Sequence, residues 1–301
     1  MTNQSTINKV LSKFGRKAEG DSSLMKPEKK EPLGTTFWLC VGWICLNIFL
    51  AIVAGFLPLI DPIAQNYDAI NSGPGLHHLL GTDDIGRDIF SRVIYGARIS
   101  IAVSFGAMAI AFGLGAPTAM LAALRRGRFD KALTTVMYSL LAFPAIIATI
   151  SVLSFWVPRN LFKVILVIGI ASTPLVYRVI RTASLAVANK DYVIAAKVQG
   201  ATDRRILIRE ILPNITPILL SFLLIGIASV VAIEGALAFL GLSISPPTPS
   251  WGNMINESRT VMSSNPWLVI FPSLALCLFI LSLNFIGDRL RNHFDVSEVK
   301  I

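Results

Sequence analysis

Residues 211–233 read ILPNITPILLSFLLIGIASVVAI, and this run decides the fold because it contains no Asp, Glu, Lys or Arg. A helix needs about 20 apolar residues to cross a bilayer whose hydrocarbon core is about 30 Å thick. Four more runs are equally free of charged residues: 37–60, 99–124, 132–158 and 260–287. Each run is long enough to cross, so the sequence predicts helices that span a membrane.

A sixth, weaker run lies between Lys163 and Arg178, with 14 uncharged residues between the two cations. It can still cross if both side chains extend toward the two membrane interfaces. The predicted fold class is therefore an all-α, polytopic membrane protein with six transmembrane helices.

The composition excludes an ordinary soluble enzyme. Of 301 residues, 53% are hydrophobic and 15% are charged, whereas globular domains have about 25% charged residues. The net charge of +9 could suggest a nucleic-acid partner, but the cations are placed otherwise. With a cytoplasmic N-terminus, 21 of the 27 Lys and Arg residues fall in the inner segments 1–36, 125–131, 178–213 and 287–301. This bias follows the positive-inside rule, and it predicts a multi-pass protein with both termini in the cytoplasm and no nucleic-acid partner.

We divide the chain into four parts. Residues 1–36 form a cytoplasmic N-terminal tail, which is either an unstructured basic segment or holds a short basic helix over 7–14 on the membrane surface. Residues 37–98 hold the first span and an outer loop, in which Thr82 or Asp83 caps an amphipathic helix lying in the outer interface. Residues 99–287 form a five-helix core, and 288–301 form a cytoplasmic C-terminal tail.

The inner segment 181–213 is predicted to contain two short helices. The first runs from about Asp191 to Gln199 and is followed by Gly200, a residue that suits the left-handed position after a helix. Thr202 or Asp203 caps the second helix, which is expected to end at Leu212, before or at Pro213.

Catalytic chemistry has little support in the sequence. The chain has three His and three Cys without metal-ligand spacing, and no Lys follows a Gly as a phosphate-binding loop requires. We therefore expect no catalytic residue and no bound metal. Glu234 is the one clear carboxylate inside a span. It either lines a substrate pathway or is a structural carboxyl bonded to another helix.

Residues 192–213 read YVIAAKVQGATDRRILIREILP, which resembles the "EAA" loop of permease subunits in bacterial ABC importers. Ala195-Ala196, Gly200 and Leu212-Pro213 keep the spacing of that motif. Ile194 replaces the usual Glu, and Glu210 stands where this branch commonly has His.

Three other stretches are similar to C-type permease subunits of dipeptide/oligopeptide importers: LGTDDIGRDIFSRVIYGARIS (80–100), FLGLSISPPTPSWGNM (239–254) and GDRLRNHFD (287–295). The resemblance covers most of residues 36–295. Tyr138 replaces a frequent Asp and Arg289 replaces a Gly, so the chain resembles a divergent member.

The resemblance implies a type I importer permease in the bacterial inner (plasma) membrane. A second, B-type permease would complete the pathway, two ATPase subunits would hydrolyse ATP with Mg²⁺, and an extracytoplasmic binding protein would deliver peptide. The chain itself would bind no cofactor. The coupling loop would contact the ATPases through Ala195, Ala196, Gly200, Ala201, Leu212 and Pro213.

Three alternatives compete with this interpretation. A stand-alone ion-coupled secondary transporter would need more ionisable groups at mid-membrane than Glu234. A membrane-embedded hydrolase would need a catalytic constellation. A nucleic-acid binder is disfavoured because the placement of the cations follows the positive-inside rule.

Overall fold

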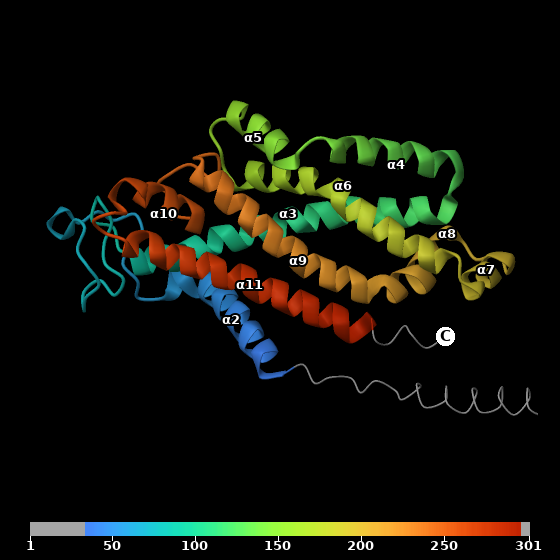
Figure 1. The fold of residues 1–301 in the computed structure, drawn as a ribbon, viewed down its shortest axis with the longest axis horizontal. Coiled ribbons are helices and arrows are strands. Elements are labelled where there is room, and N and C mark those ends of the chain that lie inside the picture. Colours follow the sequence, from blue (N-terminus) through green and yellow to red (C-terminus); the bar gives the residue numbers. More distant parts are fainter. Residues whose placement is uncertain (1–33, 296–301) are drawn as a thin grey trace, which may run out of the picture. The chain divides into compact units, whose positions relative to one another are not determined.

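Long helices run alongside one another in the computed structural model, which describes residues 34–295 (Figure 1). Residues 34–292 belong to one compact unit. Residues 1–33 of the predicted N-terminal tail, with the candidate basic helix over 7–14, lie outside the described residues, and residues 34–36 begin α2. The long helices are α2 (Gly34–Val53), α3 (Ile89–Arg125), α4 (Gly127–Ala142), α5 (Ala145–Phe155), α6 (Leu161–Ala188), α9 (Leu212–Phe239) and α11 (Trp267–Asp295).

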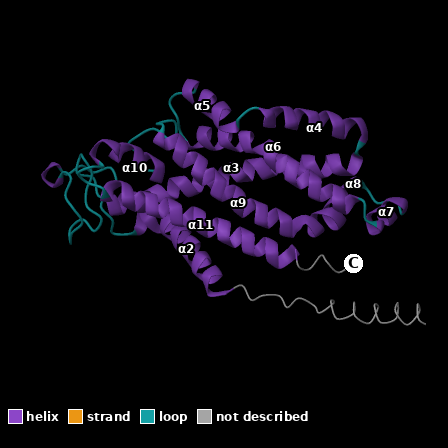
Figure 2. Ribbon diagram, viewed as in Figure 1, coloured by secondary structure: helices purple, strands orange, loops and turns teal. Residues whose placement is uncertain are grey.

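Shorter elements connect these helices. They are the 3-10 turns Ala54–Phe56, Tyr67–Ala69 and Ser258–Val261, the helices α7 (Asp191–Val198), α8 (Asp203–Ile206) and α10 (Trp251–Glu257), and a π-helical turn at Leu207–Ile211. Residues 34–295 contain no β-strand, and Figure 2 shows only helices and loops. We call the end of the bundle that carries α10 the α10 end, and the opposite end the α7 end.

The helices confirm the predicted class of fold. Within residues 34–295, five are long and apolar enough to cross a membrane, counting α8, the π turn and α9 as one continuous helix. The bent pair α4 and α5, with an angle of 78° at the break, makes a sixth if the two helices are counted as one broken span. Pro144 lies at this break, because its ring removes a backbone donor and disfavours a helical conformation at Phe143.

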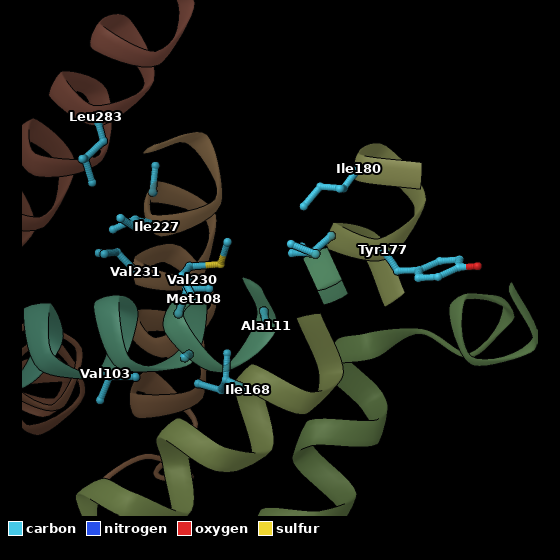
Figure 3. Packing of buried hydrophobic residues seen from close by; sticks show 14 of the residues in the cluster. Val103, Met108, Ala111, Ile168, Tyr177, Ile180, Ile227, Val230, Val231 and Leu283 are labelled. Carbon is cyan, nitrogen blue, oxygen red and sulfur yellow. The ribbon is translucent and has the colours of Figure 1, made fainter. Parts of the chain in front are cut away.

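The α3–α6 pair makes the most extensive contact between described helices, and α9 packs on α3 beside it (Figure 3). Glycines allow this close approach. A Cβ added at Gly169 would lie 3.0 Å from the carbonyl oxygen of Ala107, and one at Gly115 would lie 3.1 Å from that of Thr173. Gly113, on the other side of α3, faces open space. Small residues are the usual means of close helix packing in lipid.

The predicted interfacial helix over 83–98 is wrong. Residues 82–88 form turns, and Gly86 has a φ of +79° where its backbone approaches Asn66. The helix begins at Ile89 instead, because the Asp88 carboxylate accepts a hydrogen bond from the Ser91 amide at 2.8 Å. It then continues without interruption into the second span.

Arg87 and Arg92, which an interfacial helix would expose to water, are instead buried in an ion cluster. Arg87 and Arg92 each place a guanidinium nitrogen 2.7 Å from the same Glu257 oxygen, and Arg87 also pairs with Asp83 at 2.5 Å. Arg92 donates a further hydrogen bond to the carbonyl of Pro62. The cluster therefore ties the loop before α3 to the end of α10.

Three helices extend further than expected. The second helix of segment 181–213 does not end at Pro213 but continues through the π turn into α9. A π turn widens the helix, which accommodates the missing donor and the ring of Pro213. The helix α6 continues past Arg178 to Ala188, and α11 continues past Gly287 to Asp295.

The α3–α6 contact can be tested with two glycines of one helix. We expect Gly115→Val to lower the free energy of unfolding by about 2 kcal/mol, because the new side chain would push α3 from α6. Gly113→Val makes the same change on the open side of α3 and controls for helix propensity. Thermal unfolding of the detergent-solubilised protein measures both. Equal effects of the two substitutions would contradict this account of the packing.

Candidate functional site

Residues 189–206 connect α6 to the π turn, and we call them the elbow. Its first helix, α7, ends in a Schellman motif: the amide of Gly200 donates to the carbonyl of Lys197, and that of Ala201 to the carbonyl of Ala196, both at 3.0 Å. The Thr202 hydroxyl then caps α8 by accepting from the amide of Arg205. The predicted helix–Gly–helix structure is confirmed, with Thr202 as the cap.

Gly200 is needed for its backbone conformation. Its φ is +79°, in the left-handed region that L-residues with a side chain rarely adopt. A Cβ added there would meet no atom within 4 Å. A substitution at Gly200 therefore strains the turn without causing a clash.

Several contacts fix the elbow to the bundle. Val193 and Ile206 are fully buried against the core. Arg125, the last residue of α3, pairs with Asp203 at 2.8 Å, and Lys197 donates to the carbonyl of Leu124 at 3.3 Å. The elbow is therefore joined to the turn between α3 and α4 as well as to α6.

One face of α7 carries exposed apolar side chains. Ile194 is 50% exposed and Val198 is 83% exposed, and they lie four residues apart on one face of the helix. Ala195 and Gly200 are also exposed, whereas Ala196 and Ala201 pack partly against the core. The elbow thus presents a small apolar surface at the α7 end.

The remaining predicted coupling residues, Leu212 and Pro213, do not lie in the elbow. They begin α9 after the π turn, with Leu212 half-buried and Pro213 exposed. The sequence placed them at the end of the second helix. They instead mark the point where that helix continues into the bundle.

Glu234 is fully buried on α9, toward the α10 end. The Ser100 hydroxyl on α3 donates to one of its carboxyl oxygens at 3.1 Å, and the Ser243 hydroxyl after α9 donates to the other at 2.8 Å. The side chain reaches no surface of the described chain in this conformation. This geometry supports the structural alternative over the path-lining one.

The helix α4 of the bent pair carries an exposed face of polar, uncharged side chains. Thr135, Tyr138 and Ser139 are exposed along one face of α4. Beside them a hollow of about 480 Å³ opens between α4, α5 and α6, lined mainly by apolar side chains that include Phe143 and Trp156. An exposed polar face of this kind is unfavourable against lipid.

Sequence reasoning missed two sets of partners. The serines around Glu234 and the acidic and basic residues that pair across helices are distant in the chain, so no local pattern marks them. Arg181 on α6 and Asp130 on α4, for example, are 51 residues apart and bond directly. Among residues 34–295, no group of three His, Cys, Asp or Glu side chains is placed to hold a metal ion.

Comparison with known proteins gives consistent matches. The profile of the family described as "binding-protein-dependent transport system inner membrane component" matches residues 115–297. The dipeptide transport system permease protein DppC of Alkalihalophilus pseudofirmus is 35% identical over 261 residues, which are 85% of this chain and 84% of that protein. The glutathione transport system permease proteins GsiD of Escherichia coli and Shigella boydii are 35% identical over 283 residues, 90% of this chain and 93% of theirs.

The two alternatives for Glu234 predict different effects. We expect Glu234→Ala to lower the free energy of unfolding by about 3 kcal/mol, because it leaves a cavity and two unpaired hydroxyls. Glu234→Gln should lower it by less than about 1 kcal/mol, since an amide can still bond both serines. Thermal unfolding in detergent measures both. A Gln variant that is stable yet fails to transport would instead support a path-lining role.

Proposed function

The chain belongs to the family of binding-protein-dependent transport system inner membrane components, the transmembrane permease subunits of ATP-driven ABC importers, and we propose that it carries peptides or related small solutes. Dipeptide and glutathione permeases are among its relatives, and both solutes are small peptides. This membership supports an importer subunit and not a stand-alone ion-coupled carrier.

The elbow is proposed to couple the chain to ATPase subunits. The exposed Ile194 and Val198 offer an apolar surface outside the bundle, and exposed apolar side chains in a group are typical of protein contacts. The Schellman motif and the buried Val193 and Ile206 hold the elbow in a defined position on the bundle. A rigid element can transmit a push to the helices as rigid-body movement. ATP and Mg²⁺ are proposed to bind the partner subunits, with this chain non-catalytic.

The solute path is proposed to run along the exposed face of α4. Thr135, Tyr138 and Ser139 can form hydrogen bonds with a peptide without fixing it by charge. The face is open on the side away from α6, so one chain cannot enclose a path. A second, B-type permease subunit would close it and cover the polar face from lipid.

Charge placement supports one orientation in the membrane. Cations gather at the α7 end, on α4, α6 and the elbow, and the loop before α3 at the α10 end holds several Asp residues. By the positive-inside rule the α7 end faces the cytoplasm. Both termini would then be cytoplasmic, the membrane would be the bacterial inner (plasma) membrane, and an extracytoplasmic binding protein would deliver solute at the α10 end.

Reconstitution tests the function and the solute. The complex that copurifies with the chain is placed in liposomes with ATP inside, and uptake of labelled alanyl-alanine and of labelled glutathione is measured with the binding protein outside. We expect ATP-dependent uptake of at least one of these peptides. The chain alone, with an imposed proton gradient, should transport neither. Uptake by the chain alone would contradict the proposal.

A substitution at Gly200 tests the elbow. Gly200→Val should cost about 1–2 kcal/mol at the turn, because a β-branched residue is disfavoured at positive φ. We expect the reconstituted complex to hydrolyse ATP while solute uptake per ATP falls by about tenfold, as when a coupling interaction is lost. Gly200→Asn is the control, since Asn tolerates the left-handed region. Wild-type uptake by the Val variant would exclude the coupling role.

A further inference from the structure

Helix α4 has a single buried residue, Asp130, in its first turn. The other side chains of α4 are exposed or only partly buried, so the helix lies on the surface of the described chain. A carboxylate is the least favourable group to bury unless it is paired. The attachment of this end of α4 to the bundle therefore depends on the partner of Asp130.

That partner is Arg181 on α6. Its Nε and Nη2 atoms donate to the two carboxyl oxygens of Asp130, both at 2.6 Å. The hydroxyl of Thr134, one turn along α4, also donates to the carboxylate and lies 2.9 Å from the hydroxyl of the buried Tyr177. A two-bond Arg–carboxylate pair fixes orientation as well as distance. The pair thus holds the start of α4 at a set position on α6.

Other contacts at this part of α4 involve the partly buried Leu133 and Met137, which pack against the core, and Arg126, which donates to the side-chain oxygen of Asn189. The chain enters α4 from α3 through Arg126 and Gly127, both with positive φ, in a turn too short to set a direction by packing. Its far end meets α5 at the 78° break before Pro144, where Phe143 is extended and leaves the helical hydrogen-bond pattern. Helix α4 is therefore a short helix with a sharp bend at one end and an ion pair at the other.

The helix that carries Arg181 leads directly into the elbow. Only Asn189 and Lys190 separate the end of α6 from the start of α7. Arg181 lies two turns before that end, within the continuous helix. A displacement of the elbow therefore reaches Arg181 along an unbroken helix, and reaches Asp130 through two short hydrogen bonds.

We infer that the Asp130–Arg181 pair transmits movement of the elbow to α4, which then swings about the break at Pro144 and changes the proposed solute path. This inference rests on the proposed function, because it takes the elbow as the point where the ATPases act. The path-facing residues Thr135, Tyr138 and Ser139 lie between the pair and the break. Rotation of α4 would therefore move them together.

Spin labels on the two halves of the bent pair can follow this movement without knowledge of the solute. Cysteines replace the exposed Val136 on α4 and Phe155 on α5, in a chain whose three native cysteines are changed to alanine. The distance between labels is measured in the reconstituted complex with and without a non-hydrolysable ATP analogue. We expect nucleotide to change this distance, and Asp130→Asn and Arg181→Gln to abolish the change.

Matched controls separate the pair from general effects of charge. Lys131→Gln removes a charge from the next residue of α4, and Arg178→Gln removes an exposed cation one turn before Arg181 on α6. Both should keep the nucleotide-dependent distance change. Where the neutral variants fail to assemble, Arg181→Lys tests the linkage with the charge kept, because an ammonium lacks the guanidinium fork.

Uptake of the peptide found by reconstitution gives a second readout. The Asp130 and Arg181 variants should still hydrolyse ATP, with uptake per ATP reduced by about tenfold. A distance change or uptake like that of the unmodified complex in an assembled Asp130→Asn or Arg181→Lys variant would overturn the inference. So would a label distance in the unmodified complex that does not respond to nucleotide.

The Gly200 substitution distinguishes this inference from the proposal on which it rests. If Gly200→Val abolishes the distance change and Asp130→Asn does not, the elbow couples to the ATPases and the ion pair does not transmit. If Asp130→Asn abolishes it and Gly200→Val does not, the pair positions α4 but the proposed role of the elbow fails.

Discussion

The close contact between α3 and α6 is the constraint on which the other elements depend. In lipid there is little hydrophobic force to hold helices together, so they need large areas of van der Waals contact. Gly115 and Gly169 provide this by bringing the backbone of each helix against the other. The helices α2, α4, α5 and α9 each pack on one or both of these helices, and α11 packs against α9. A side chain added at the contact would therefore displace more than the two helices that it separates.

Ion pairs at the two ends of the bundle attach peripheral elements to the central helices. At the α10 end, Glu257 joins two arginines of the loop and of α3, so the loop before α3 is held to α10. At the α7 end, Asp130 joins α4 to α6. Removing one member of such a pair leaves a partly buried charge unpaired, which is more damaging than losing the pair itself. The same chemistry therefore fixes a loop at one end and a surface helix at the other.

The sequence was sufficient for features that depend on local pattern. The long runs without charged residues predicted the spans. Gly200 and Thr202 predicted the turn of the elbow, because a left-handed glycine and a helix cap act on residues next to them in the chain. The sequence did not predict features that depend on contacts between residues far apart in the chain. The apolar and polar residues of 83–98 are spaced as on the two faces of an interfacial helix. The partner of Arg87 and Arg92 is however Glu257, far along the chain. The predicted helix end at Pro213 was wrong for another reason, because a π turn can accommodate a proline that a regular α-helix cannot.

The low hydropathy of the fourth predicted span and its position at the centre of the bundle have the same physical cause. Of the five single-helix spans in residues 34–295, α6 is the least apolar and the most buried. A helix surrounded by protein need not be apolar on all faces, because neighbouring helices can satisfy its polar groups. Thr173, Tyr177 and Arg181 lie on α6 and bond within the bundle. Tyr177 and Arg181 are among the polar groups that lower its hydropathy, and both bond to α4. The weakest span predicted from the sequence is therefore the one that holds α4 and leads into the elbow.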